Sequence, residues 1–187
     1  MPFTAFHPGV VWPLWKRAPQ RLDFVALTVG ATIPDLLEVL FVYLLPDYYW
    51  THREWSHSLL GAVTYDLGVA LIATVLVVRP LLFWLDRIHP SPLWSQYGGH
   101  EFREARPFPV MALSATVGAL SHVLVDIPFH PESPLLFPLF PALQVVPRSQ
   151  LWTVGNLSAI LFGSLFLYLL YVNWWRPAHP RARATVK

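Results

Sequence analysis

Long apolar stretches, separated by shorter polar segments, dominate the chain. A helix needs roughly 20 residues to cross a bilayer, and four apolar stretches come close to or exceed that length, at residues 22–45, 59–78, 110–127 and 151–175. An extension of the second stretch to residue 85 stays open. The last stretch contains no charged residue and shows no polar face of helical period. The pattern therefore predicts an all-α integral membrane bundle of four transmembrane helices, formed by a single domain over residues 1–175.

The composition agrees with a lipid environment. Hydrophobic residues make up 55% of the chain and charged residues 13%, whereas soluble domains carry about 25% charged residues. The absence of cysteine excludes a disulfide framework and a thiolate metal site. A net charge of +2 is too small to suggest nucleic acid as a partner. The expected partner is the lipid bilayer, and the oligomeric state stays open.

The basic residues predict an orientation. Two of them, Arg53 and Arg148, lie in the connections after the first and third stretches. The other eleven lie before the first stretch, between the second and third, or after the fourth: Lys16, Arg17, Arg21, Arg79, Arg87, Arg103, Arg106, Arg176, Arg181, Arg183 and Lys187. By the positive-inside rule, this distribution predicts a multi-pass cell-membrane protein with both termini in the cytoplasm and a basic cytoplasmic tail at 176–187.

Several ionisable residues interrupt the apolar stretches, namely Asp35, Glu38, Asp66, His122 and Asp126. Each costs about 2.5–3.5 kcal/mol at the centre of a membrane helix on insertion scales, so each needs an explanation. His122 and Asp126 are four residues apart and share a helix face. They can bind one metal ion, bridge two, or form a hydrogen-bonded pair. Asp35 follows Pro34, which suits either an acid aimed inward or a cap at a helix break.

A polar segment before the second stretch adds a histidine at the membrane boundary. We expect Ser56 to cap that helix, which would place His57 and Ser58 in its first turn. The topology then brings four groups on three spans to a similar depth near the external leaflet: Asp35, His57, His122 and Asp126. Imidazole and carboxylate ligands suit a divalent metal ion, with zinc first and manganese or iron as alternatives.

His7 precedes the first stretch, and simple topology puts it across the membrane from the other four groups. It can join them if residues 5–17 form a re-entrant half-helix packed against protein. An interfacial N-terminal helix is the alternative. The sequence leaves the side of the membrane on which His7 lies open.

The order of these motifs resembles that of the LexA-binding, inner-membrane-associated hydrolase family, which is described as membrane-bound and metal-dependent. The matching elements are His7, Pro34-Asp35, His52-Arg53, Ser56-His57-Ser58 and His122-x-x-x-Asp126. The MPFT-x-x-H opening also resembles a related group of membrane proteins. The resemblance covers residues 1–130.

The resemblance implies metal ligands at His7, Asp35, His57, His122 and Asp126. It also makes His52 and His130 candidates for a second metal or for proton transfer. The chain departs from the family pattern at Glu54, where glycine is common, and at Ser56, where threonine is common. Leu36 and Leu37 replace an acid and a histidine that some members carry, which weakens the case for a second metal there.

These observations lead to three functional hypotheses. The first is a metal-dependent hydrolase that activates water for an amphiphilic substrate, such as a lipid phosphoester, at the external side. The second is a transporter or ion-handling protein, since intramembrane Asp and His also form proton and cation paths. Only the first stretch has an interior Pro-Asp break, however, and no second half mirrors it. The third is a non-catalytic membrane scaffold with a structural metal.

Overall fold

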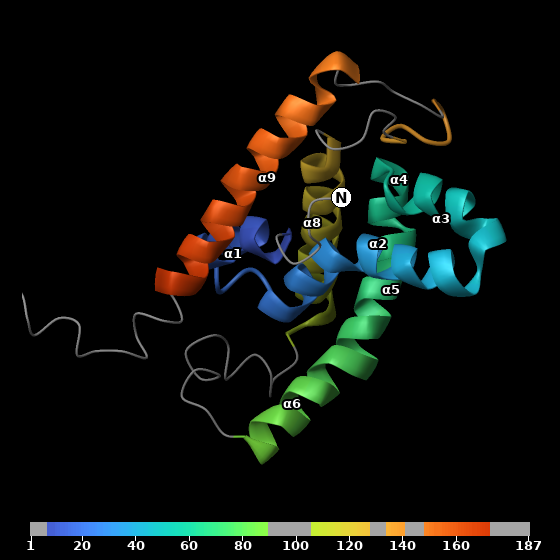
Figure 1. The fold of residues 1–187 in the computed structure, drawn as a ribbon. Helices are drawn as coiled ribbons and strands as arrows, with labels where there is room; N and C mark the ends of the chain where they lie inside the picture. Colours follow the sequence, from blue (N-terminus) through green and yellow to red (C-terminus); the bar gives the residue numbers. More distant parts are fainter. Residues whose placement is uncertain (1–6, 90–105, 128–133, 141–147, 173–187) are drawn as a thin grey trace, which may run out of the picture.

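The computed structural model describes residues 7–89, 106–127, 134–140 and 148–172, and the secondary structure in these ranges is helical, with no strand (Figure 1). This confirms the all-α prediction for the described part of the chain. In chain order, the elements are α1 (His7–Arg17), α2 (Phe24–Leu44), the 3-10 helix η2 (Pro46–Tyr48), α3 (Tyr49–Ser56), α4 (Leu59–Val63), α5 (Tyr65–Ala73), the π-helix η3 (Thr74–Val78), α6 (Arg79–Ile88), α8 (Phe108–Asp126) and α9 (Arg148–Leu170).

Three helices are long and apolar enough to cross a membrane. They are α2, the continuous helix Tyr65–Ile88 and α8, with mean hydropathies of 1.8, 2.1 and 1.7. The fourth predicted span, 151–175, falls largely on α9, of which Ala159–Leu169 is a shorter apolar helix, and residues 173–175 lie outside the described ranges. Length and composition thus support three of the four predicted spans, and the fourth stays a prediction.

The second span lies further along the chain than the sequence predicted. The prediction was 59–78, but α4 ends at Val63, and Thr64 leaves the helical region with φ −124° and ψ −78°. The long helix then runs from Tyr65 to Ile88. It continues through Arg79, whose buried guanidinium pairs with the carboxylate of Asp23, the N-cap of α2. The sequence does not reveal this distant partner.

Helices α2 and α8 form the centre of the bundle. The backbone N–H of Asp23 donates to Ser114 Oγ at 2.8 Å, and His122 Nδ1 lies 3.0 Å from the carbonyl oxygen of Ala31. Each contact joins a residue to one that lies 91 positions later in the chain. Because this offset is the same at both contacts, the first half of α2 runs in the same direction as α8. Small residues such as Gly118 let the two backbones approach closely, as at other interfaces between membrane helices.

Replacing Gly118 by alanine is therefore expected to disrupt the bundle. The new Cβ would overlap the carbonyl oxygen of Leu27 and lie 2.8 Å from the backbone nitrogen of Ala31, so a backbone would have to move. Overpacking of this kind costs about 1–3 kcal/mol. The matched control is Gly68→Ala, where a Cβ meets nothing within 4 Å. Thermal unfolding in detergent, followed by circular dichroism, should show a lower midpoint for Gly118→Ala only; equal midpoints would contradict this interface.

Helix α1 is short and packs against protein. It contacts α2, α8 and α9, and its Val11 is fully buried with Leu27 and Ala31 (Figure 1). Its 11 residues give a length of about 16 Å, roughly half the hydrocarbon thickness of a bilayer. Gly9 allows the close approach of Phe166 from α9. The short N-terminal helix that the sequence predicted is thus present, and its first residue is His7.

Candidate metal centre

Five buried side chains meet where α1, α2 and α8 approach the end of α3. They belong to His7, Asp35, His57, His122 and Asp126, called here the His–Asp cluster, and each whole residue is at most 4% exposed. All five are the residues that the sequence predicted as metal ligands. The structure brings them together, including His7, which simple topology had separated from the rest. Metal binding itself stays a prediction.

Local structure explains how two of these residues reach the cluster. Pro34 lies inside α2 and lacks a backbone N–H, so it weakens the helical turn beside Asp35. His57 is the C-cap of α3, where its backbone N–H donates to the carbonyl of Arg53 at 3.1 Å. The predicted cap was wrong: Ser58, not Ser56, caps the next helix, by accepting from Gly61 N at 2.9 Å. His57 therefore lies between two helices instead of within a first turn.

The ring nitrogens approach carboxylates at distances too long for hydrogen bonds. His122 Nε2 and His57 Nε2 lie 3.5 and 3.7 Å from Asp35 Oδ1, and His7 Nε2 lies 3.8 Å from Asp35 Oδ2. His57 Nε2 is 3.7 Å from Asp126 Oδ2. A good N–H···O bond is about 2.7–3.2 Å long. Two ligands on one tetrahedral zinc, with bonds of about 2.0–2.2 Å, lie about 3.3–3.6 Å apart. The nitrogen–oxygen distances in the cluster are therefore closer to the separation of two ligands on one metal ion than to the length of a hydrogen bond.

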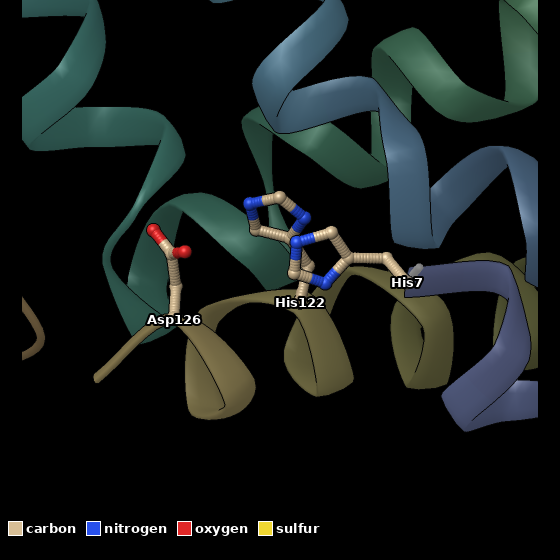
Figure 2. Close-up of side chains that lie close together, drawn as sticks. All are labelled: His7, His122 and Asp126. Atoms are coloured by element: carbon tan, nitrogen blue, oxygen red, sulfur yellow. The ribbon is translucent and has the colours of Figure 1, made fainter. Parts of the chain in front are cut away.

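Two sets of three donors share His122. The first comprises His7, His122 and Asp126, and the second Asp35, His57 and His122; within each set, the donor atoms lie within 4.8 Å of one another. Figure 2 shows the first set, with the carboxylate of Asp126 following His122 along α8. The rings of His7 and His122 are stacked, with centroids 4.0 Å apart. Three imidazoles and two carboxylates form a ligand set that suits zinc, manganese or iron.

The hydrogen bond of His122 determines which of its nitrogens can bind metal. Its Nδ1 lies 3.0 Å from the carbonyl oxygen of Ala31, which can only accept, so Nδ1 carries the proton. Nε2 then has a free lone pair and faces Asp35. His57 is held similarly, with its Nδ1 2.8 Å from Ser56 Oγ. Metal-binding histidines usually have their second ring nitrogen fixed in this way.

His7 gives a direct test of whether a metal fits. Burial lowers the pKa of His7, although the charges of Asp35 and Asp126 oppose this shift, so the neutral imidazole is favoured. Neither ring nitrogen has a hydrogen-bond partner among the residues that the structure describes. Buried polar atoms are normally satisfied. A metal ion bound to a ring nitrogen would satisfy it, so the residues present fit the metal that the family resemblance implies.

The sequence reasoning left Glu38 out of the site, although it noted the residue inside an apolar stretch. Glu38 Oε2 lies 3.9 Å from His57 Nε2, and Glu38 Oε1 accepts from Arg53 Nη1 at 2.5 Å. Glu38 is three residues after Asp35 and so shares its helix face. This spacing could have been used to include Glu38 in the predicted site. The pairing with Arg53 depends on α3 folding back along α2, which no local pattern reveals.

The two candidates for a second metal or for proton transfer, His52 and His130, stay predictions. His130 and the side chain of His52 lie outside what the structure describes. Leu36, at a position where some members of the resembled family carry an acid or histidine, is 60% exposed, away from the cluster.

Comparison with known proteins gives one finding. The whole chain, residues 1–187, matches a family model described as a domain of unknown function (DUF4184). Neither curated proteins nor solved structures yielded a match. The family match names no activity, so the resemblance to the membrane-bound hydrolases remains a hypothesis that depends on the motifs.

Proposed function

We propose that this chain, which belongs to the DUF4184 family, is a multi-pass membrane protein whose His–Asp cluster binds a divalent metal ion for hydrolysis. The observation that carries the proposal is the convergence of five buried donors at ligand-like spacing, with four imidazole–carboxylate pairs, which together include all five residues, separated by 3.5–3.8 Å. A divalent cation would also balance the charges of Asp35 and Asp126. A core held only by hydrogen bonds would favour shorter contacts.

The chemistry follows from the donor set. A bound divalent ion with one open position supplies hydroxide, because it lowers the pKa of coordinated water toward about 7. His122 presents Nε2 with its lone pair free, and Ala31 holds that ring in place. Arg53 holds one oxygen of Glu38 and leaves the other facing His57. A carboxylate or histidine that is not a ligand then moves protons.

The surroundings favour an amphiphilic substrate. Three helices are apolar and long enough to cross a membrane, and the excess of basic residues on one side predicts both termini in the cytoplasm. In that orientation the cluster lies toward the external leaflet, because His122 and Asp126 belong to the C-terminal end of α8. A lipid phosphoester combines an apolar part that a bilayer would hold with an ester bond that a metal-dependent hydrolase would cleave. The localisation and the substrate class both belong to the proposal.

Metal analysis of matched variants tests the site. Purified wild-type protein, prepared without chelator, should contain stoichiometric zinc, manganese or iron. Asp126→Asn should lose it, because an amide is a much poorer metal ligand than a carboxylate. Asp47→Asn, at an exposed position in η2, is the matched control and should keep the metal. Full retention of metal by Asp126→Asn would remove this residue from the site.

Activity measurements separate the hypotheses that share a metal. Hydrolysis of lipid phosphoesters by the wild type, lost in Asp126→Asn, would support the enzyme. A metal without turnover of any such substrate would instead favour a structural ion in a scaffold. Ion flux in proteoliposomes would favour transport.

A further inference from the structure

A second buried acid lies outside the His–Asp cluster and has no role in the proposed hydrolysis. Asp66, in the first turn of α5, is fully buried. Neither of its carboxylate oxygens has a hydrogen-bond partner within the described ranges. A buried carboxylate without partners is strongly unfavourable, and the group avoids this cost by becoming neutral. The burial and the missing partners therefore point to a carboxylic acid rather than a carboxylate.

The surroundings of Asp66 are apolar. Ala70, one turn later on the same face, packs in a cluster with Val29, Ile33 and Ala115. Ala62, four residues earlier in the chain and in α4, belongs to a cluster with Ala119 of α8. Along the chain, Asp66 thus lies between residues of two apolar clusters. It belongs to neither of the two sets of three metal donors found in the described residues.

The backbone next to Asp66 is interrupted. Helix α4 ends at Val63 and α5 begins at Tyr65, with Thr64 between them outside the helical region. The first N–H groups of a helix have no partner within it. Discontinuous helices whose ends face the protein interior are typical of ion-binding sites in membrane proteins. The break and the buried acid occur together, and each is a separate observation.

The ligand follows from what the site offers. Sodium, calcium and magnesium ions need several oxygen ligands, and Asp66 is not part of any donor group found in the described residues. A proton needs only one carboxylate oxygen. Thr74, two turns further on the same face, is also fully buried, and its hydroxyl has no partner in the described ranges. We propose that Asp66 is a proton-binding site inside the bundle, separate from the His–Asp cluster.

This site would give the chain a proton-handling function in addition to hydrolysis. Intramembrane carboxyls of this kind carry protons in pumps and transporters. Binding converts the carboxylate and one proton into the neutral acid, and release reverses this step. No oxidant or other reactant is needed.

The test uses dicyclohexylcarbodiimide, an apolar reagent, on the full-length protein in phosphatidylcholine vesicles. The O–H of a protonated carboxyl adds across one C=N bond: the oxygen bonds to the central carbon, the proton moves to nitrogen, and the adduct rearranges to a stable acylurea. At neutral pH, peptide mass spectrometry should find the adduct on Asp66 and not on the exposed Asp47. Asp66→Asn should abolish this adduct and keep the wild-type metal content.

Infrared spectroscopy gives a second measurement that does not depend on reagent access. The difference between wild type and Asp66→Asn should contain the C=O stretch of a protonated carboxyl. Carboxylate bands in its place, at neutral pH, would overturn the proposal. Loss of metal from folded Asp66→Asn would overturn the separation of this site from the His–Asp cluster. Because neither readout requires hydrolysis, failure of the proposed enzyme would leave the result on Asp66 interpretable.

Discussion

Replacing His122 by alanine is expected to reduce metal affinity by more than about 100-fold, since even partners outside the ligand shell contribute about 10–100-fold. His122 belongs to both sets of three donors, so its loss breaks both. Its Nε2 also faces Asp35 at 3.5 Å. Elemental analysis of detergent-purified protein should find stoichiometric metal in the wild type and none above background in the variant.

Two further variants make this result specific. His89→Ala removes an exposed histidine at the end of α6 and should keep its metal. His122→Asn has an amide nitrogen at the level of Nδ1, so it can still donate to the carbonyl of Ala31, but it has nothing at the position of Nε2. It should lose the metal as completely as His122→Ala while staying closer to the wild type in thermal stability. Wild-type metal content in both His122 variants would exclude this residue as a ligand.

Replacing Arg79 by methionine is expected to cause the largest loss of stability, because it leaves the carboxylate of Asp23 buried without its cation. Asp23 is fully buried, pairs with Arg79 and caps α2 by accepting from Ala26 N at 2.8 Å. Removing one partner of a buried ion pair typically costs about 3–5 kcal/mol. Unfolding in detergent, followed by circular dichroism, should show this loss.

A double variant distinguishes loss of the charge partner from loss of packing. Asp23→Asn removes the charge and keeps a good helix cap, so the pair Asp23→Asn with Arg79→Met should recover most of the stability. The folded fraction should keep its metal, because Asp23 precedes Asp35 by 12 residues, about 18 Å along α2. Ordinary surface substitutions change the free energy of unfolding by about 0.5 kcal/mol or less. A change of that size for Arg79→Met would show that the ion pair contributes little to stability.

The helices could be predicted more reliably than their ends. The predicted spans 22–45 and 110–127 correspond closely to α2 and α8, because a long apolar stretch is a local property that sums over its own residues. The second span was displaced for two reasons. Thr64 interrupts the helix, and Arg79 continues it despite its charge. The pairing of Arg79 depends on Asp23, a residue far away in the chain.

The candidate site was predicted from ionisable residues whose insertion into an apolar, membrane-spanning stretch costs free energy. Asp35, His122 and Asp126 stand out because an apolar stretch should not contain them. His7 and Glu38 were harder to place. His7 reaches the cluster because α1 packs between α2 and α9, and Glu38 matters because Arg53 folds back onto it. Neither contact leaves a pattern in the neighbouring sequence.

The sequence by itself determined the helical class, the apolar stretches and the set of polar residues that need an explanation, because hydrophobicity and charge cost are set residue by residue. The tertiary structure decided which of those residues meet. It fixed the register of α2 against α8 through small residues such as Gly118, and so aligned Asp35 with His122. It also left Asp66 apart from that cluster, between apolar side chains. The physical reason is that burial and pairing are properties of neighbours in space, which lie far apart along this chain, as His7 and His122 do.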